Sequence, residues 1–207
     1  MPHPKYDAVM FDLLTALLDS WSLWNSVAGS EAAGLAWRGK YLELTYGAGP
    51  YRAYEGIIGE AAAAAGLASS LGEALLARWA EIPPWPETAE VLAGLGQKFP
   101  LAVATNCSDA LAEIAVACSG GSFRAVATAE NSGFYKPRPE PYRKALAMLG
   151  LPAERVLFVA GSAADVPGAT AVGMPVFWHN RRRLKPADPA IHPMAEADSL
   201  WPLLDSI

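Results

Sequence analysis

The sequence predicts an α/β protein in which a parallel sheet carries helices on both faces and a helical segment is inserted after the first strand. Three observations predict this fold class. An apolar run at residues 9–11 indicates a buried strand near the N-terminus. Residues 20–84 then show helical periodicity without a strand pattern. From residue 87 onward, short apolar runs alternate with helical stretches, as in βαβ units with right-handed crossovers.

The first strand ends at a carboxylate. Asp12 directly follows Val9, Met10 and Phe11, where the strand runs into a loop. Ligands of open parallel sheets bind beyond the carboxyl ends of the strands, so Asp12 stands where chemistry is usually done. A carboxylate there can act as a nucleophile, a base or a metal ligand. The alternative is that Asp12 caps the segment that follows.

The insertion is expected to be helical throughout. Asp19 and Ser20 offer an N-cap for its first helix. Three prolines near residue 84 end the insertion as a stiff connector. The helices of this segment are expected over residues 20–46, 51–67 and 70–79.

The rest of the chain alternates strands and helices. Strands are expected at residues 101–105, 125–128, 155–160 and 175–179, and helices at 87–98, 111–117, 139–149, 163–172 and 199–204. The whole pattern predicts a Rossmann-like parallel sheet. We expect residues 1–19 and 85–207 to form an α/β core domain and residues 20–84 to form a helical cap domain.

Composition restricts the classes of protein and partner. Of the 207 residues, 52% are hydrophobic and 18% charged, which indicates a globular chain rather than a disordered one. The net charge of −5 argues against nucleic acid as a partner. Two cysteines without metal-ligand spacing, no signal-like N-terminus and no apolar run approaching ~18 residues predict a cytoplasmic protein without a membrane span.

Polar residues follow the other strands at corresponding positions. Thr105 and Asn106 end the second strand, and Ser162 and Asp165 follow a later one. Each residue alone is more often a cap, turn or loop residue, but together they predict a site. Lys136 is the candidate cation that keeps the Asp12 carboxylate ionised and balances an anionic substrate. Asp165 can orient that lysine or polarise a water molecule.

These motifs resemble the haloacid dehalogenase superfamily, and most closely its L-2-haloacid dehalogenase branch. The resemblance implies that Asp12 is a nucleophile that forms an ester intermediate. It also implies that an arginine of the cap binds the substrate or the leaving halide. The matching segments are Phe11–Asp12, Thr105–Asn106, Lys136–Pro137 with Tyr142, residues 159–165, and Trp37–Arg38.

The chain departs from the phosphatases of that superfamily. They carry a general acid two residues after the nucleophile, where this chain has Leu14. They also carry a second acidic magnesium ligand where this chain has Ser162. Asp12 and Asp165 alone supply an octahedral magnesium site poorly, so no metal and no cofactor are expected.

The chain also departs from the dehalogenases. It carries Thr15–Ala16 where they usually have Gly-Thr, so Thr15 is a candidate to supply the missing hydroxyl from a different backbone position. Ala160 and Ser162 replace a serine and an asparagine, and Ala164 replaces a tryptophan. The substrate is therefore open to change.

The predicted function is a hydrolase that displaces a leaving group at C2 of a small 2-substituted carboxylic acid. Asp12, Lys136 and Asp165 are the catalytic candidates. The substrate-binding candidates are Leu14, Thr15, Trp24, Arg38, Thr105, Asn106, Tyr142 and Ser162. Two alternatives stay open: ring opening of a strained cyclic amino acid such as L-azetidine-2-carboxylate, and non-catalytic binding of a small acid or a partner protein. The resemblance also allows a homodimer packed through cap helices.

The expected cap is rich in aromatic residues, which favours a snug apolar pocket. Most of these rings are expected to pack between helices, with two or three of the seven in the site. They are Trp21, Trp24, Trp37, Tyr41, Tyr46, Tyr51 and Tyr54.

Overall fold

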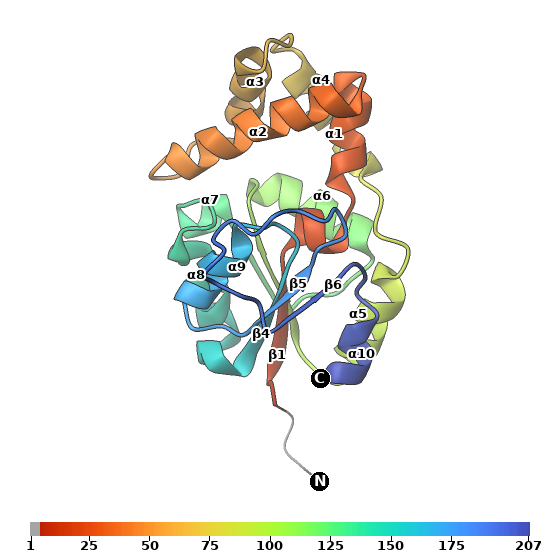
Figure 1. Cartoon of the computed structure of the whole chain (residues 1–207), viewed down its shortest axis with the longest axis vertical. Coiled ribbons are helices and arrows are strands. Elements are labelled where there is room, and N and C mark those ends of the chain that lie inside the picture. Colours follow the sequence, from red (N-terminus) through yellow and green to blue (C-terminus); the bar gives the residue numbers. More distant parts are fainter. Residues whose placement is uncertain (1–4) are drawn as a thin grey trace.

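A computed structural model describes residues 5–207, so the first four residues of the expected core domain lie outside the described part. Six parallel strands form one sheet in the order β3-β2-β1-β4-β5-β6, with helices on both faces (Figure 1). The predicted fold class is confirmed. The strands are β1 (Ala8–Phe11), β2 (Leu101–Thr105), β3 (Ala125–Thr128), β4 (Val156–Ala160), β5 (Val176–His179) and β6 (Ala195–Ala197).

Strand β1 lies in the middle of the sheet, between β2 and β4, and determines where Asp12 lies. It pairs with β2 through Val9 and Leu101, and with β4 through Met10 and Phe158. The chain runs outward from β1 in one direction to β3 and in the other to β6. Such a reversal of strand order opens a crevice at the carboxyl ends of the two central strands. Asp12 follows β1 at that crevice.

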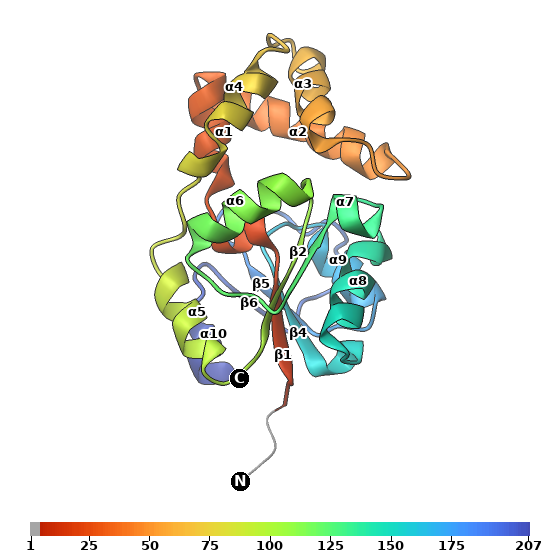
Figure 2. The same ribbon diagram turned by 180° about the vertical axis from the view of Figure 1, so that it is seen from behind.

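Alternating side chains of β1 build the two halves of the core. Val9 and Phe11 belong to a cluster with the buried residues of α5, α6 and α10, while Ala8 and Met10 face those of α8 and α9. Figure 2 shows these helices on opposite sides of the sheet. The helices are α5 (Thr88–Gly96), α6 (Asp109–Ser119), α7 (Ala129–Ser132), α8 (Pro139–Leu149), α9 (Asp165–Ala171) and α10 (Pro202–Ser206).

The inserted segment forms a helical layer over the carboxyl edge of the sheet (Figure 1). It contains α1 (Ser20–Ala28), α2 (Glu31–Gly47), α3 (Tyr54–Ala64), α4 (Leu71–Ala77) and a 3₁₀ turn, Trp79–Glu81. The single helix expected over residues 20–46 is wrong. Gly29 ends α1 with a φ of 83°, and the Ser30 hydroxyl accepts a hydrogen bond from the amide of Ala33 to begin α2.

Four short elements were not expected from the sequence. They are a π-helical turn at Leu13–Leu17, helix α7, a 3₁₀ turn at Ala153–Arg155 and strand β6. Each has five residues or fewer, which is too short for a periodic pattern to emerge. Among residues 5–207, no helix combines the length and the apolar character that crossing a bilayer requires.

Candidate active site

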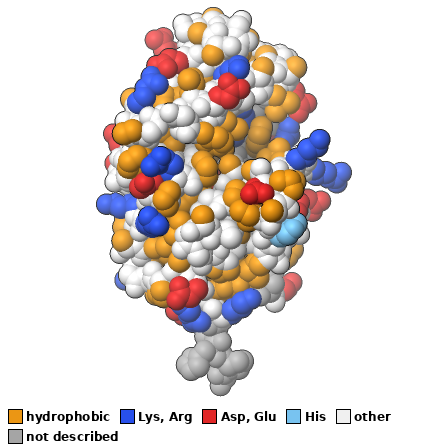
Figure 3. Space-filling view, turned by 60° about the vertical axis from the view of Figure 1, so that its left-hand side comes forward, with side chains coloured by type: hydrophobic (Ala, Val, Ile, Leu, Met, Phe, Trp, Pro, Cys, Tyr) orange, Lys and Arg blue, Asp and Glu red, His pale blue; other side chains and the backbone are white. Residues whose placement is uncertain are grey.

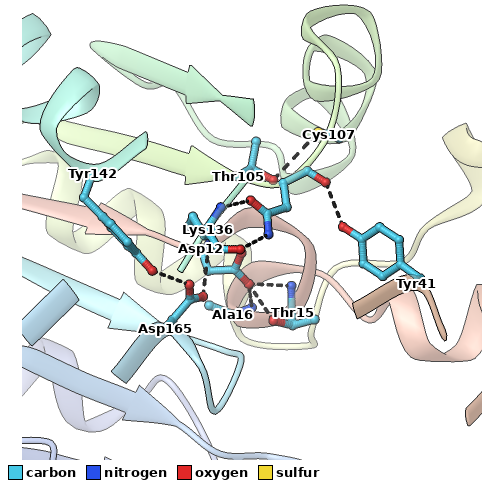
Figure 4. A network of polar contacts seen from close by, with 10 residues as sticks. Asp12, Thr15, Ala16, Tyr41, Thr105, Cys107, Lys136, Tyr142 and Asp165 are labelled. Carbon is cyan, nitrogen blue, oxygen red and sulfur yellow. Dashed lines mark hydrogen bonds and ion pairs between the residues drawn. The ribbon is translucent and has the colours of Figure 1, made fainter. Parts of the chain in front are cut away.

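The two carboxylate oxygens of Asp12 have different partners (Figure 4). Oδ2 accepts hydrogen bonds from the Thr15 amide at 2.9 Å, the Thr15 hydroxyl at 2.5 Å and the Ala16 amide at 3.1 Å. Oδ1 accepts one from Lys136 Nζ at 2.8 Å. One oxygen therefore caps the π-helical turn, which confirms the capping interpretation, while the other faces the cation and leaves the chemical role a prediction.

The turn that holds Asp12 depends on a glycine. A Cβ atom on Gly161 would lie 2.2 Å from the Ala16 amide nitrogen and 2.5 Å from the Thr15 hydroxyl oxygen. Real Cβ atoms do not approach that closely, so only glycine lets the loop after β4 pack against this turn.

Lys136 bridges two buried carboxylates. Its Nζ lies 2.8 Å from Asp12 Oδ1 and 3.0 Å from Asp165 Oδ2, and all three side chains are almost fully buried. The Asn106 side chain positions the lysine backbone, because it accepts from the Lys136 amide at 2.7 Å and donates to the Lys136 carbonyl at 3.0 Å. The strand-end amide thus positions the cation.

Asp165 is held from its other side by a tyrosine. The Tyr142 hydroxyl donates to Asp165 Oδ1 at 2.7 Å, while Oδ2 accepts from Lys136. Asp165 is the first residue of α9, at the carboxyl end of β4. A Cβ on Gly168, one turn along that helix, would lie 2.7 Å from the Tyr142 hydroxyl oxygen, so glycine makes room for this contact.

The three charges shift one another's pKa values. Burial alone would raise the pKa of the Asp12 carboxyl, but the charge of Lys136 and hydrogen bonds from Lys136 and Thr15 hold it below the usual value. Burial, together with the charge of Asp12, raises the pKa of Asp165 despite Lys136. Burial works against the charged lysine, yet the two carboxylates raise the pKa of Lys136. At neutral pH the Asp12 carboxylate is therefore ionised beside an ammonium.

These carboxylates do not fit a divalent cation. The ammonium of Lys136 lies between Asp12 and Asp165, where a shared cation would have to bind. Tyr142 and Thr15 occupy further oxygens of the same pair. In the described part of the chain, no group of three or more His, Cys, Asp or Glu side chains has an arrangement that could hold a metal ion.

A cavity of about 330 Å³ opens above Asp12, between the sheet and the helical layer. Arg38 of α2 lines it and is only 8% exposed. Its guanidinium stacks 3.9 Å from the ring centre of Trp21 and donates to the Ser20 hydroxyl at 3.1 Å. Within residues 5–207, Arg38 Nε has no hydrogen-bond partner, and the guanidinium is in no ion pair. A buried cation without a counter-ion faces the same space as the Asp12 carboxylate.

A family model of the haloacid dehalogenase-like hydrolases matches residues 6–173, which span all the residues of this cluster. The chain belongs to the haloacid dehalogenase-like hydrolase family.

Individual relatives of this dehalogenase-like hydrolase agree with that assignment. An (S)-2-haloacid dehalogenase of Pseudomonas putida is 30% identical over 197 residues, which cover 85% of this chain and 86% of that protein. An (S)-2-haloacid dehalogenase of Xanthobacter autotrophicus is 30% identical over 82% of this chain and 73% of its own. A solved L-2-haloacid dehalogenase superposes with a TM-score of 0.86 at 27% identity, covering 98% of both chains.

The structure of this hydrolase brings most predicted site residues to the cavity. Those that line it are Asp12, Leu14, Thr15, Trp24, Arg38, Asn106, Lys136, Ser162 and Asp165. Thr105 and Tyr142 are not among the lining residues, so the structure does not bring them to the cavity with the others, and their contact with substrate stays a prediction. The Thr105 hydroxyl lies 3.8 Å from Cys107 Sγ, and Tyr142 supports Asp165.

Two groups of cavity residues differ from the sequence prediction. Five of the seven aromatic rings line the cavity rather than two or three: Trp21, Trp24, Tyr41, Tyr46 and Tyr54. The loop after β5 was missed, although Leu184, Lys185 and Ala187 also line the cavity. Its only signal in the sequence is its place at the carboxyl end of a strand, because it carries no recognisable motif.

Proposed function

We propose that this hydrolase cleaves the carbon–halogen bond at C2 of 2-halo carboxylic acids. The observation that carries the proposal is that Asp12 and Arg38 line the same cavity. A buried guanidinium without a counter-ion favours binding of an anion. The substrate carboxylate or the departing halide meets that need. The relatives named above, called (S)-2-haloacid dehalogenases, support the same chemistry.

The first step is displacement at carbon. Asp12 Oδ1 has a single protein donor, Lys136, and keeps a lone pair for attack on C2. As the new carbon–oxygen bond forms, the carbon–halogen bond breaks and the halide leaves with its electron pair. A halide needs no proton, which agrees with the aliphatic Leu14 side chain in the cavity wall.

The second step is hydrolysis of the ester. Attack through Oδ1 leaves Oδ2 as the ester carbonyl oxygen, which retains the Thr15 and Ala16 donors. These donors form an oxyanion hole for the addition of water to the Asp12 carboxyl carbon. Asp165 has a raised pKa and is placed to take the proton of the water and return it to the departing 2-hydroxy acid.

The structure disfavours the two alternatives. A strained ring nitrogen is cationic at neutral pH, and the Arg38 guanidinium in the same cavity repels it. A purely binding role would not need an ionised carboxylate with a free lone pair facing the cavity beside a positioned lysine.

Isotope labelling tests this proposal. Excess enzyme undergoes a single turnover with 2-chloropropionate in ¹⁸O water. The protein is then digested, and the masses of its peptides are measured by mass spectrometry. We expect one ¹⁸O atom in the peptide that contains Asp12, none in the peptide that contains Asp165, and unlabelled product. Asp12→Asn should release no halide while keeping its fold. If the label appeared only in the product, water would attack C2 directly, and the mechanism through an ester on Asp12 would be wrong.

A phosphatase assay provides a second check. Leu14 cannot protonate a leaving alcohol, and the carboxylates do not fit magnesium. We therefore expect no turnover of p-nitrophenyl phosphate with magnesium. Turnover that disappears in Asp12→Asn would contradict this mechanism.

A further inference from the structure

The cavity is larger than a small halo acid needs. Its volume of about 330 Å³ lies at the lower end of the range for drug-sized ligands. A three-carbon halo acid has about six non-hydrogen atoms and fills roughly half of such a space, given ~30 Å³ per water-sized group. A large part of the cavity is therefore available to a substituent on the reacting carbon.

The walls of that space are predominantly apolar. Aromatic rings line it on the side of the helical layer, with Trp21 and Trp24 from α1 and Tyr41 from α2 among them. On the sheet side, Ala163 and Ala164 line it with small side chains. Figure 3 shows hydrophobic side chains around the hollow between the two layers. An aromatic or branched apolar group gains from both features, because rings offer stacking surfaces and the alanines leave room.

A loop closes the cavity on one side and is held in a defined place. The buried Asn180 side chain accepts from the Leu184 amide at 2.7 Å and donates to the Leu184 carbonyl at 3.0 Å. The neighbouring Arg182 pairs with Glu31 of α2 at 2.7 Å and so ties the loop to the helical layer. Leu184 thereby contributes a further apolar surface to the cavity.

We propose that the substrate of this hydrolase is a 2-halo acid with a bulky apolar side chain, of which 2-chloro-3-phenylpropionate is the simplest aromatic example. This inference rests on the proposed function and adds the substrate class. The acid group and C2 bind between Arg38 and Asp12. The side chain extends between the aromatic rings and the alanines at residues 163 and 164 toward Leu184.

A second acid group is the competing possibility for the same space. Lys185 lines the cavity edge, but its side chain is exposed and already solvated. The apolar walls would desolvate a second carboxylate, which costs free energy without a buried partner. The structure therefore favours an apolar side chain over a diacid.

Substrate comparison tests the proposal in the wild-type enzyme. Halide release is measured with racemic 2-chloropropionate, 2-chloro-3-phenylpropionate and 2-chlorosuccinate. We expect kcat/KM for the phenyl substrate to exceed that for chloropropionate by about tenfold or more. Chlorosuccinate should be the poorest substrate. The corresponding products give a binding readout: 3-phenyllactate should inhibit more strongly than lactate.

A cavity-filling variant sharpens the test. Ala164→Trp adds a large ring to the wall formed by Ala163 and Ala164. It should lower kcat/KM for 2-chloro-3-phenylpropionate relative to kcat/KM for 2-chloropropionate at least tenfold. Ala190→Trp places the same ring on an exposed residue that does not line the cavity, and should leave that ratio unchanged. Circular dichroism verifies the fold of both variants.

The outcomes separate the two proposals. Halide from chloropropionate with little or none from the phenyl substrate would overturn the substrate class and leave the proposed function intact. A preference for 2-chlorosuccinate would show that the substrate carries a second acid group rather than an apolar side chain. If no 2-chloro acid releases halide, the proposed function itself fails.

Discussion

Asp12 shows how one carboxylate can cap a turn through one oxygen and present the other oxygen to a cavity. Its Oδ2 atom is fully engaged by donors of the π-helical turn, whereas Oδ1 has only the lysine. The hydroxyl at this turn comes from Thr15, in agreement with its prediction as a replacement donor. The Thr15 hydroxyl thus reaches the Asp12 carboxylate, although Thr15 precedes by one residue the position where the dehalogenases usually carry a threonine.

Removal of that hydroxyl should slow the reaction. Thr15→Val keeps the shape of the side chain and the backbone amide but loses one donor to a charged oxygen, which costs about 1.5–3 kcal/mol. We expect kcat to fall about 10- to 100-fold, because the same donor stabilises the ester oxyanion. Thr15→Ser should recover most of the rate. Equal losses in both variants would point to packing rather than to the hydroxyl.

The pH dependence should be governed by Asp165 rather than by Asp12. The pKa of Asp165 is raised and that of Asp12 lowered, so Asp165 is protonated first as the pH falls. The Tyr142 hydroxyl opposes this rise through its hydrogen bond to the ionised carboxylate. Tyr142→Phe should therefore shift the acid limb of the kcat/KM profile to higher pH.

Halide release across the acid range measures that shift. Tyr6→Phe is the matched control, because Tyr6 is equally buried but its hydroxyl contacts Met194 Sδ, away from the site. A shift to lower pH in Tyr142→Phe, or an equal shift in the control, would contradict the assigned role of the hydroxyl.

At the scale of elements, the π-helical turn is held from behind by three side chains. Trp85 Nε1 donates to the Thr15 carbonyl at 3.1 Å, and the Thr88 hydroxyl donates to the Leu17 carbonyl at 2.7 Å. His179 Nδ1 lies 2.9 Å from the Ala16 carbonyl oxygen. Three consecutive carbonyls are thus bound by residues that precede or begin α5 and end β5. This arrangement fixes the amides that hold Asp12.

Thr88→Val should test the importance of this support. The substitution removes one of the two donors to the buried Leu17 carbonyl, which still accepts from the Trp85 amide at 3.1 Å, at a cost of about 0.5–1.5 kcal/mol in the free energy of unfolding. Urea denaturation measures that loss. We also expect a lower kcat for halide release with KM little changed, because the turn positions the nucleophile. A variant with full activity would show that the other two side chains suffice.

The helical layer depends on close approach between helices. A Cβ on Gly72 of α4 would lie 2.9 Å from the Cα of Gly59 in α3. Gly72→Ala should therefore lower the free energy of unfolding by about 1–3 kcal/mol. Gly39→Ala in α2 is the control, since a Cβ there meets nothing within 4 Å, and should stabilise by ~0.5–1 kcal/mol. Urea titrations of both variants distinguish steric clash from helix propensity.

At the scale of the whole molecule, the helical layer and the sheet share one hydrophobic cluster, which includes Trp37 and Val103. Hydrogen bonds also join the helical layer to the rest of the core: the Tyr41 hydroxyl donates to the Asn106 carbonyl at 3.1 Å, and Trp79 Nε1 donates to the Leu111 carbonyl of α6 at 3.0 Å. The cavity therefore lies between two parts that are packed together. Whether these two parts are separate domains stays a prediction.

Unfolding should therefore be a single cooperative transition. Tryptophan fluorescence reports mainly the helical layer, where Trp21, Trp24, Trp37 and Trp79 lie, and circular dichroism reports the whole chain. We expect the two transitions in urea to coincide. An earlier transition in fluorescence would show that the helical layer unfolds as a separate unit.

The homodimer stays a prediction. Large exposed hydrophobic side chains are spread over several elements, and α2 carries two of them, Leu35 and Tyr46. Sedimentation velocity decides between monomer and dimer. The absence of nucleic-acid partners and the cytoplasmic location are likewise predictions from composition.

The sequence by itself determined the strands β1 to β5 and the polar residues that follow them, but not the short strand β6. Val9 to Phe11 and Leu101 to Thr105 are runs of local hydrophobicity, and such runs report burial directly. It also identified Asp12, Lys136 and Asp165, since parallel strands bring their carboxyl ends together.

Only the tertiary structure decided which polar groups face the cavity. Thr105 and Asn106 are neighbours in the chain, yet only Asn106 lines the cavity. The alternation of side chains along an extended backbone separates such neighbours, and a motif does not state which side is occupied. Tertiary packing likewise placed Leu184 and Asp12 in the wall of the same cavity. Contacts between residues so distant in sequence leave no local pattern.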